Sequence, residues 1–257
     1  MSEKSLYIYE SGEYWNDIPD YLAGQAPNKI KWLLQIVDFD ALIKELPQNQ
    51  LAIVDIGCGV GMVSTGLAEQ LRNRYPEIDI EHYGFDLSPH AIEVARKRNN
   101  NGTFVCGDFK TVEKRWDLAL LCDIIEHVED PNEFLQSVAE RSRFFVVGFA
   151  MDNNVAYHLS KSRRKIVDNS SHISLFNETR ARSVGGKFGR ILASGYIPNP
   201  MARNLKIRSV KNIITLPLRM ALQVFSRRLK GRLFGGESLY LFCESRLDDS
   251  SAISDGE

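Results

Sequence analysis

Cysteine is scarce in this chain, and its spacing matches neither a disulfide framework nor a zinc site. The 257 residues include four cysteines, which lie far apart and form no CxxC pair. This usage is typical of a reducing compartment. The longest uncharged apolar run, at 144–151, has eight residues, whereas a membrane-spanning helix needs about 20. No apolar core of signal-peptide type stands near the N-terminus. Together these absences predict a cytoplasmic protein without a transmembrane segment.

The charges nearly cancel over the whole chain but are unevenly distributed. Residues 151–235 carry 17 Lys and Arg against 3 Asp and Glu, whereas residues 1–150 carry 14 against 24. Within the basic half, residues 203–232 have nine basic side chains and no acid. Three interpretations stay open for this segment: an ordinary packed helix with solvated charges, contact with an anionic substrate or an anionic membrane surface, or contact with RNA. Its few aromatic residues make nucleic acid the less favoured partner.

Short apolar runs alternate with amphipathic segments along most of the chain. Strands are predicted at 51–57, 78–86, 103–108, 116–123, 143–150, 190–197 and 238–245. Helices are predicted at 28–46, where Pro27 would start the helix, and at 60–74, 89–99, 131–141 and 177–187. No strand is expected in the polar stretch 152–174. Strands separated by helices predict βαβ units, and therefore an α/β protein with a parallel sheet.

The most informative local pattern is VDIGCGVG at 54–61. A buried strand ends near an acid, and Gly57, Gly59 and Gly61 follow before a helix. Glycines let the backbone turn tightly and approach a ligand closely. The pattern is not the nicotinamide fingerprint, because Met62 stands where its third glycine would fall. A Walker loop is also excluded, since no GK[ST] follows.

Four motifs in order resemble the class I S-adenosylmethionine-dependent methyltransferases over about residues 50–150. These motifs are VDIGCGVG, then GFDLSPHAIEVARKR at 84–98, VCGDF at 105–109 and DLALLCDIIEHVEDP at 117–131. The resemblance implies a Rossmann-like sheet of seven strands, with helices on both faces and an antiparallel last strand. It also implies S-adenosylmethionine as the methyl donor.

The resemblance further implies which residues contact the cofactor. Asp86 would bind the ribose hydroxyls, Asp108 would meet the adenine amine, and the glycine turn would offer N–H groups to the methionine carboxylate. The full predicted cofactor set is Asp55, Gly57, Cys58, Gly59, Gly61, Asp86, Leu87, Asp108, Phe109 and Cys122. Two alternatives remain: Asp55 only satisfies the turn, and Asp108 is a plain turn aspartate.

A DxxEH cluster after the fourth strand holds the first candidate catalytic groups. Ubiquinone-type O-methyltransferases and small-RNA 2′-O-methyltransferases carry ExxEH here and use it for magnesium or a similar ion. This chain has the shorter Asp123 ahead of Glu126 and His127, and many relatives carry EH without a metal. A divalent metal at these three residues is therefore considered but not favoured, and Glu126 and His127 are predicted to shape the acceptor pocket.

The other catalytic candidate is His172 in SSHISLF. A histidine titrates near neutral pH and can take a proton from an acceptor hydroxyl. The alternative is that it only orders its loop.

Four regions are expected. They are a helical N-terminal lid at 1–46, a Rossmann-like cofactor-binding core at 47–150, a basic acceptor-binding cap with the last two strands at 151–245, and a disordered acidic tail at 246–257. The predicted function is methyl transfer to an oxygen of a small or lipid-linked acceptor. An acceptor with an anionic group is one variant of this prediction. RNA methylation is the first alternative, and a non-catalytic, cofactor-sensing or partner-binding protein of the same fold is the second. The predicted location is the cytoplasm, with attachment to a membrane surface as a variant.

Overall fold

The computed structural model describes residues 19–46, 48–169, 172–198, 218–222 and 224–246. The first 18 residues of the predicted lid, most of the basic segment 203–232 and nearly all of the predicted tail therefore lie outside the described residues.

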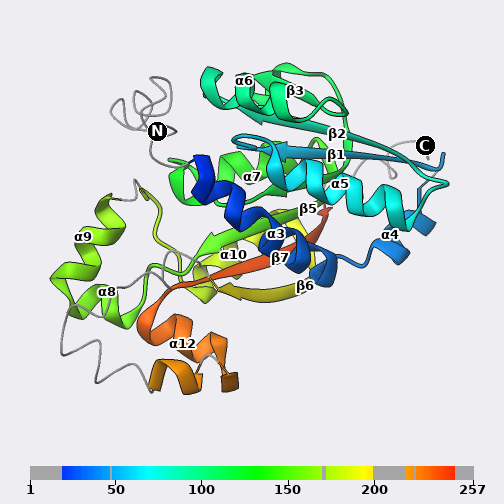
Figure 1. The fold of residues 1–257 in the computed structure, drawn as a ribbon. Coiled ribbons are helices and arrows are strands. Elements are labelled where there is room, and N and C mark those ends of the chain that lie inside the picture. The colour runs from blue at the N-terminus through cyan, green and yellow to red at the C-terminus, as the bar shows by residue number, and fades with distance from the viewer. Residues whose placement is uncertain (1–18, 47, 170–171, 199–217, 223, 247–257) are drawn as a thin grey trace, which may run out of the picture.

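A single sheet of seven strands forms the centre of the molecule (Figure 1). The strands are β1 (Gln50–Ile56), β2 (Asp79–Asp86), β3 (Thr103–Cys106), β4 (Trp116–Leu121), β5 (Ser142–Ala150), β6 (Gly189–Pro198) and β7 (Glu237–Ser245). Their order across the sheet is β3-β2-β1-β4-β5-β7-β6. The first five strands pair in parallel, whereas β7 lies antiparallel between β5 and β6. The predicted Rossmann-like sheet with an antiparallel last strand is confirmed.

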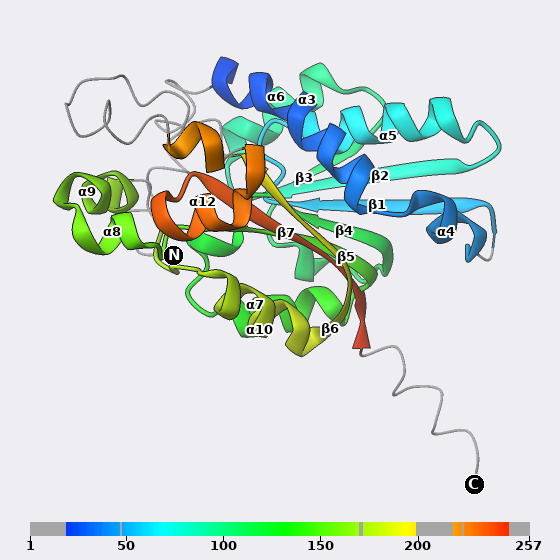
Figure 2. The ribbon, with the colours of Figure 1, turned by 90° about the horizontal axis from the view of Figure 1, so that it is seen from below.

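Helices cover both faces of the sheet, with α3, α5 and α6 on one side and α7 and α10 on the other (Figure 2). The α-helices of the first half are α3 (Pro19–Ile36), α4 (Phe39–Lys44), α5 (Met62–Arg74) and α6 (Pro89–Arg98). Those of the second half are α7 (Pro131–Ala139), α8 (Val155–Leu159), α9 (Lys161–Asn169), α10 (Glu178–Phe188) and α12 (Arg227–Phe234). Two 3₁₀ turns, η1 (Phe109–Thr111) and η2 (Ile125–His127), follow β3 and β4. Among these described helices, none has the length and apolar character needed to cross a membrane.

The core consists of two apolar layers separated by the sheet. Alternate residues of β1 enter opposite layers: Leu51 and Ile53 face α3 and α5, whereas Val54 and Ile56 face the α7 and α10 side. This double burial is why the strand reads as a continuous apolar run. Leu33 of α3 is fully buried in the first layer. Because α3 packs on α5 and β6, the described part of the predicted lid contributes to the core.

Two expectations about helices need correction. Pro27 does not start a helix but lies inside α3. The helix that was predicted to run to 46 ends at Ile36, and Asp38 caps the separate helix α4 by accepting a hydrogen bond from the Ala41 N–H. The stretch 152–174, for which the sequence predicts no strand, has none among its described residues and contains α8 and α9. Asn154 starts α8 by accepting from the Tyr157 N–H, a side-chain cap that polar composition alone does not reveal.

The order of the strands fixes where a ligand can bind. From β1 the chain adds β2 and then β3 on one side of that strand. It then returns and adds β4 on the other side of β1, within the same sheet, so the strand order reverses between β1 and β4. In open α/β sheets, ligands bind outside the carboxyl ends of the strands at such a switch point. The candidate residues after β1, β2 and β4 all lie at that edge.

Candidate functional site

The glycine turn after β1 is built to close against β2. Gly57 has φ of +72°, and a Cβ there would lie 2.5 Å from Cδ1 of Ile124. Glycine is therefore required both by backbone conformation and by space. The N–H groups of Gly57 and Cys58 donate to the Phe85 carbonyl, and the Gly59 N–H donates to Asp86 Oδ2 at 2.8 Å. These N–H groups are already used inside the protein. They hold the shape of the turn, and the expectation that the turn offers N–H groups to a carboxylate ligand stays a prediction.

Asp86 stands at the carboxyl end of β2 with both carboxylate oxygens fixed. Oδ2 accepts from the Gly59 N–H, and Oδ1 accepts from the Ser88 N–H at 2.9 Å. Burial raises the pKa of Asp86, although the two N–H groups work against this shift. Each oxygen keeps a further lone pair for a ligand hydroxyl. Leu87, the next residue, is 45% exposed and presents an apolar surface beside it.

Asp108 and Phe109 follow β3 in the 3₁₀ turn η1. Asp108 accepts from the Lys110 N–H and forms a 3.3 Å ion pair with its Nζ, with 43% of the side chain exposed. These contacts match the plain turn aspartate that the sequence left open as an alternative. Phe109 is buried and meets Phe134 edge-on. It therefore supports the turn from below.

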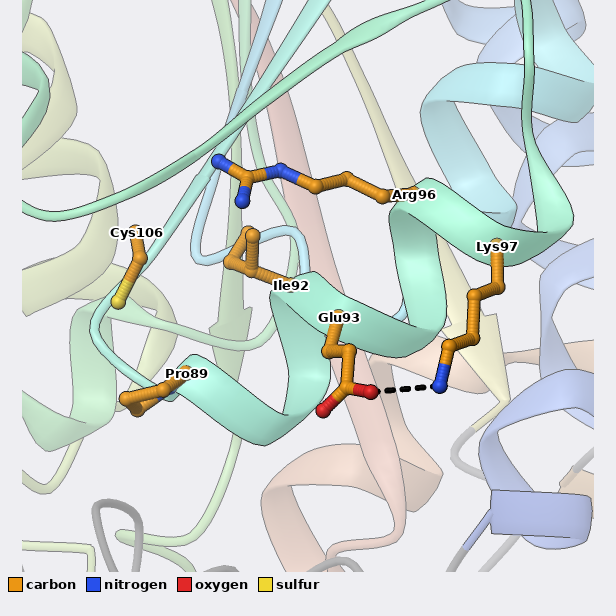
Figure 3. A pocket seen from close by; sticks show the side chains of 6 residues that line it. All are labelled: Pro89, Ile92, Glu93, Arg96, Lys97 and Cys106. Carbon is orange, nitrogen blue, oxygen red and sulfur yellow. Dashed lines mark hydrogen bonds and ion pairs between the residues drawn. The ribbon is translucent and has the colours of Figure 1, made fainter.

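A pocket of about 370 Å³ lies on the outer side of α6 (Figure 3). It is lined by Pro89, Ile92, Glu93, Arg96, Lys97 and Cys106. Glu93 and Lys97 pair with each other across its rim at 2.5 Å. None of the predicted site residues lines this pocket, so the candidate chemistry lies elsewhere.

Asp55 lies beneath the glycine turn near the end of β1. Its side chain is 2% exposed, and burial raises its pKa to about 6, while hydrogen bonds from Ser64 and the charge of Lys29 limit the rise. Ser64 belongs to α5, which starts directly after the turn. The contacts therefore favour the structural alternative, in which Asp55 ties the first strand to the helix that follows.

Lys29, which the sequence analysis did not single out, reaches this edge from α3. Its Nζ lies 2.6 Å from Oδ2 of Asp123, and only 13% of the lysine side chain is exposed. Asp123 follows β4 with a left-handed φ of +59°, and its Oδ1 accepts a 3.4 Å hydrogen bond from Tyr240. Loss of water lowers the pKa of Lys29, but the charge and hydrogen bond of Asp123, together with the nearby Cys122 and Asp55, outweigh this, so the net shift of the pKa is upward. Lys29 and Asp123 therefore form a fixed ion pair at the carboxyl ends of β1 and β4.

The predicted catalytic groups come together beside this ion pair. His127 and His172 meet edge-on with their ring centres 5.0 Å apart, and Nε2 of His172 lies 4.0 Å from Oε1 of Glu126. The N–H groups of Ile173 and Ser174 donate to the Glu126 carbonyl at 2.9 and 3.0 Å. These two bonds fasten the His172 loop onto η2.

Asp152 completes the cluster, and the sequence analysis missed it. Its Oδ2 lies 2.6 Å from Nδ1 of His172. Burial lowers the pKa of His172, but the hydrogen bond and charge of Asp152, together with the charges of Glu126 and Asp123, outweigh it, so the net shift of the pKa is upward. Asp152 lies just beyond the carboxyl end of β5. Asp86 and Asp123 have the equivalent places at the carboxyl ends of β2 and β4. A search for acids at the carboxyl ends of all predicted strands would have found it.

Glu126 has the most unusual environment of the cluster. It is 2% exposed, and its Oε2 is buried with no hydrogen-bond partner among the described residues. Burial and the nearby charge of Asp123 raise its pKa. A carboxyl held in this way keeps its proton toward neutral pH and can donate a hydrogen bond to a ligand.

The residues that could hold a metal differ from the predicted set. Glu126, His127 and His172 each offer one ligand atom, and the three atoms lie within 4.8 Å of one another. Asp123 instead pairs with Lys29, whose ammonium already supplies a positive charge there. The Nδ1–Asp152 contact leaves Nε2 of His172 available to an ion, as is common for histidine ligands. The donor set fits a small divalent ion held by Glu126, His127 and His172, not by the predicted Asp123, Glu126 and His127.

Three features define a class I methyltransferase fold. They are the glycine turn at the end of the first strand, the acids at the ends of the following strands and the strand order β3-β2-β1-β4-β5-β7-β6. Comparison with known proteins agrees, since a model of the methyltransferase domain family matches residues 47–194. The chain belongs to this family.

Curated relatives of this chain include ubiquinone biosynthesis O-methyltransferases. The protein of Cereibacter sphaeroides strain ATCC 17029 is 28% identical over 151 residues, which cover 54% of this chain and 58% of the relative. The mitochondrial protein of Schizosaccharomyces pombe is 31% identical over 98 residues, covering 35% of this chain and 33% of the relative. The matches thus span about half of the length of such relatives or less.

Solved structures share the fold at low sequence identity. Magnesium protoporphyrin IX methyltransferase from Synechocystis, with bound SAH, gives a TM-score of 0.55 at 17% identity and covers 93% of this chain and 96% of its own. The plantazolicin methyltransferase BamL, in complex with a triazolic desmethylPZN analog and SAH, gives a TM-score of 0.57 at 15% identity, and the match covers 93% of each chain. This likeness extends over nearly the whole chain, including the two strands that lie beyond the core motifs.

Proposed function

We propose that this protein transfers the methyl group of S-adenosylmethionine to an oxygen of a small, lipid-linked acceptor. The observation that carries the proposal is the Asp152–His172 pair beside Glu126, at the strand edge where the methyltransferase fold binds its cofactor. The family supports methyl transfer as the reaction class. The named O-methyltransferase relatives support oxygen as the acceptor atom.

The cofactor supplies a sulfonium methyl that is already activated, and the protein residues bind and orient. Asp86 would accept hydrogen bonds from the ribose hydroxyls through the free lone pairs of its fixed oxygens. Leu87 would cover one face of the adenine, Asp108 would meet the adenine amine, and the buried Phe109 would support the turn that carries Asp108. The roles of Asp86 and Asp108 follow from the family resemblance, and the exposed apolar surface of Leu87 supports its place beside the adenine.

We assign the amino-acid end of the cofactor to Lys29 and Asp123. The N–H groups of Gly57, Cys58 and Gly59 in the glycine turn already donate hydrogen bonds within the protein. We therefore expect a positively charged side chain to bind the methionine carboxylate. Lys29 can supply that cation, and Asp123 can accept from the methionine ammonium. The ion pair is thus complementary to a zwitterion, and charge-assisted bonds of this kind are the strong ones.

The proton of the acceptor hydroxyl would go to Nε2 of His172. Asp152 at Nδ1 holds the ring in one orientation and stabilises the imidazolium that forms. Glu126, which keeps its proton toward neutral pH, can donate to the acceptor oxygen and place it. In this proposal His172 is the base, Glu126 donates a hydrogen bond to the acceptor oxygen, and the Asp152 carboxylate positions the His172 ring.

Replacing Asp152 by Asn is expected to shift the acidic limb of the kcat/KM profile to lower pH. The carboxylate raises the pKa of His172, so its removal lets the imidazole lose its proton at lower pH. The maximal kcat should fall by about 10–100-fold, as for other lost orienting partners. A profile measured from pH 5 to about 9 checks both effects. If kcat fell while the acidic limb of the kcat/KM profile stayed at the same pH, Asp152 would act only by holding the His172 loop in place.

Removing divalent metal is expected to leave turnover within about twofold of its starting value. An ion at Glu126, His127 and His172 would add Lewis-acid charge near the acceptor oxygen, but the proposed proton path needs none. The measurement is turnover after dialysis against EDTA, with Mg²⁺, Mn²⁺ or Zn²⁺ added back. Loss on chelation with recovery on one ion would assign the His172 ring to that ion and would contradict its role as the base.

Transfer of label from methyl-labelled S-adenosylmethionine tests the function itself. The acceptor panel should contain phenols with and without an isoprenoid tail, a lipid extract and bulk RNA. Label in the tailed phenols or the lipid extract supports the proposal. Label in RNA would favour the alternative that the sequence left open. Cofactor binding without turnover of any acceptor would favour the non-catalytic alternative.

The sequence also predicts the boundaries of the regions, the location of the protein and a membrane contact. The four predicted regions and the cytoplasmic location follow from the sequence alone and stay predictions. A lipid-linked acceptor requires access to a membrane, and contact of the basic segment with an anionic membrane surface would provide it. Residues 203–217 of that segment lie outside the described residues.

A further inference from the structure

Large apolar side chains are exposed unevenly over the described surface. Ten of them are exposed, and seven belong to two short segments, 155–159 and 218–229. These seven are Val155, Leu159, Leu218, Met220, Val224, Phe225 and Leu229. Val224 and Phe225 are 80% and 84% exposed, which makes them nearly as accessible as in an unfolded chain. Clusters of this kind on a protein surface mark sites of interaction.

The two segments lie at the same end of the molecule as the candidate site. Helix α8 starts shortly after the carboxyl end of β5, and α12 leads into the start of β7, where Ser238 pairs with Ala150. Helices α8 and α12 contact each other, and both views show them side by side (Figures 1 and 2). We call the exposed apolar residues of 155–159 and 218–229, with the basic residues among and beside them, the apolar–basic face.

The charges within residues 218–234 have one sign. Residues 218–234 contain five basic side chains and no acid: Arg219, Arg227, Arg228, Lys230 and Arg232. Arg228 pairs with Glu178 of α10, and Lys230 pairs with the buried Glu237 of β7, both at 2.6 Å. These two ion pairs fasten α12 to the body of the protein. Arg232 is exposed on the same helix, and Lys161, Arg164 and Lys165 are exposed on the neighbouring α9.

We propose that the apolar–basic face docks on bilayers that contain anionic phospholipids. Exposed apolar residues among basic ones are the composition of segments that lie in the membrane interface, with the apolar side chains below the headgroups and the basic ones beside them. The described part of the face has one aromatic residue that is highly exposed, Phe225, whereas binding of single-stranded nucleic acid relies on several stacking platforms. The face therefore fits a lipid surface better than RNA.

Docking in this way would bring the candidate catalytic residues close to the membrane. Ile173, next to His172, is itself 43% exposed at this end of the sheet. A lipid-linked acceptor could then reach His172 with its tail still in the bilayer. This consequence rests on the proposed function, but the docking itself does not.

Vesicle flotation of the full chain, without cofactor or acceptor, tests the proposal. One vesicle set is phosphatidylcholine alone, and the other contains phosphatidylcholine and phosphatidylglycerol at about 3:1. We expect binding to the anionic vesicles only, with weakening as the salt rises from about 0.05 to about 0.5 M. The double variant Val224→Ser and Phe225→Ser should reduce the partition coefficient at least about tenfold, as expected for two large side chains that no longer enter the interface.

Leu192→Ser is the matched control, since Leu192 is 40% exposed on β6 and outside the face. It should bind like the unaltered chain, and thermal unfolding should show that all variants are folded. Equal loss in both variants, or no flotation with anionic vesicles, would overturn the proposal. Salt-dependent binding of RNA without vesicle binding would also overturn it, in favour of a nucleic-acid surface. Because turnover of soluble acceptors is measured separately, a failed flotation leaves the methyl-transfer proposal standing.

Discussion

Replacing His172 by Asn is expected to lower kcat by about 10²–10⁴-fold, the usual contribution of a general base. The amide can still bond to Asp152, so the loop should keep its place, but it cannot take the proton of the acceptor. Binding of the cofactor product S-adenosylhomocysteine should change by less than about threefold, because His172 lies on the acceptor side of the site. Single-turnover rates and calorimetric titration measure the two quantities.

The chain offers a matched control for this variant. His158 is exposed on α8 and contacts Asn153 at 2.7 Å, away from Glu126 and His127. His158→Asn should leave the rate unchanged. If His172→Asn kept the full rate, the proton would have to leave by another route, and the Asp152–His172 pair would be a structural contact only.

Replacing Lys29 by Met is expected to separate two ligands that differ only in their amino-acid end. S-adenosylhomocysteine carries the carboxylate that Lys29 would bind, whereas 5′-methylthioadenosine lacks it. Loss of a charge-assisted bond costs about 1.5–3 kcal/mol, or about 10–150-fold in Kd. The affinity for S-adenosylhomocysteine should fall by that factor, and the affinity for 5′-methylthioadenosine should fall by less than about threefold.

Two further variants sharpen the comparison. Lys31 is exposed on the same helix, so Lys31→Met removes an equal charge outside the site and should affect neither ligand. Asp86→Ala should weaken both ligands alike, because both contain the ribose. Equal weakening of the two ligands by Lys29→Met would show that the lysine supports the fold of the site without contacting the cofactor.

The sequence predicted the sheet well because its signals are local. The β-branched run at 51–57 and the glycines that follow determine a buried strand and a tight turn within a few residues. The same holds for Asp86, which directly ends a predicted strand. Helix α3 shows the limit of such signals: the local sequence around Pro27 predicts a helix start, but the packing of α3 on α5 and β6 supports a continuous helix through this residue.

The site was predicted only in part, for a different physical reason. His172, His127 and Glu126 were recognised, but their meeting depends on how the loop after α9 folds back onto η2. Lys29 could not be placed, since no feature of α3 shows which of its lysines faces the end of a strand far along the chain. Asp152 could have been found, because it follows the same strand-end rule as the other acids.

The place of β7 has a consequence for biosynthesis. Because β7 lies between β5 and β6, β6 cannot join the sheet until the ribosome has made residues 237–245. Until then, the edge of β5 is an unpaired template for other strands, which is a known route to aggregation. Tyr240, which contacts Asp123, belongs to this same strand. A nascent chain would therefore acquire a complete active-site edge only in the step that also protects it from aggregation.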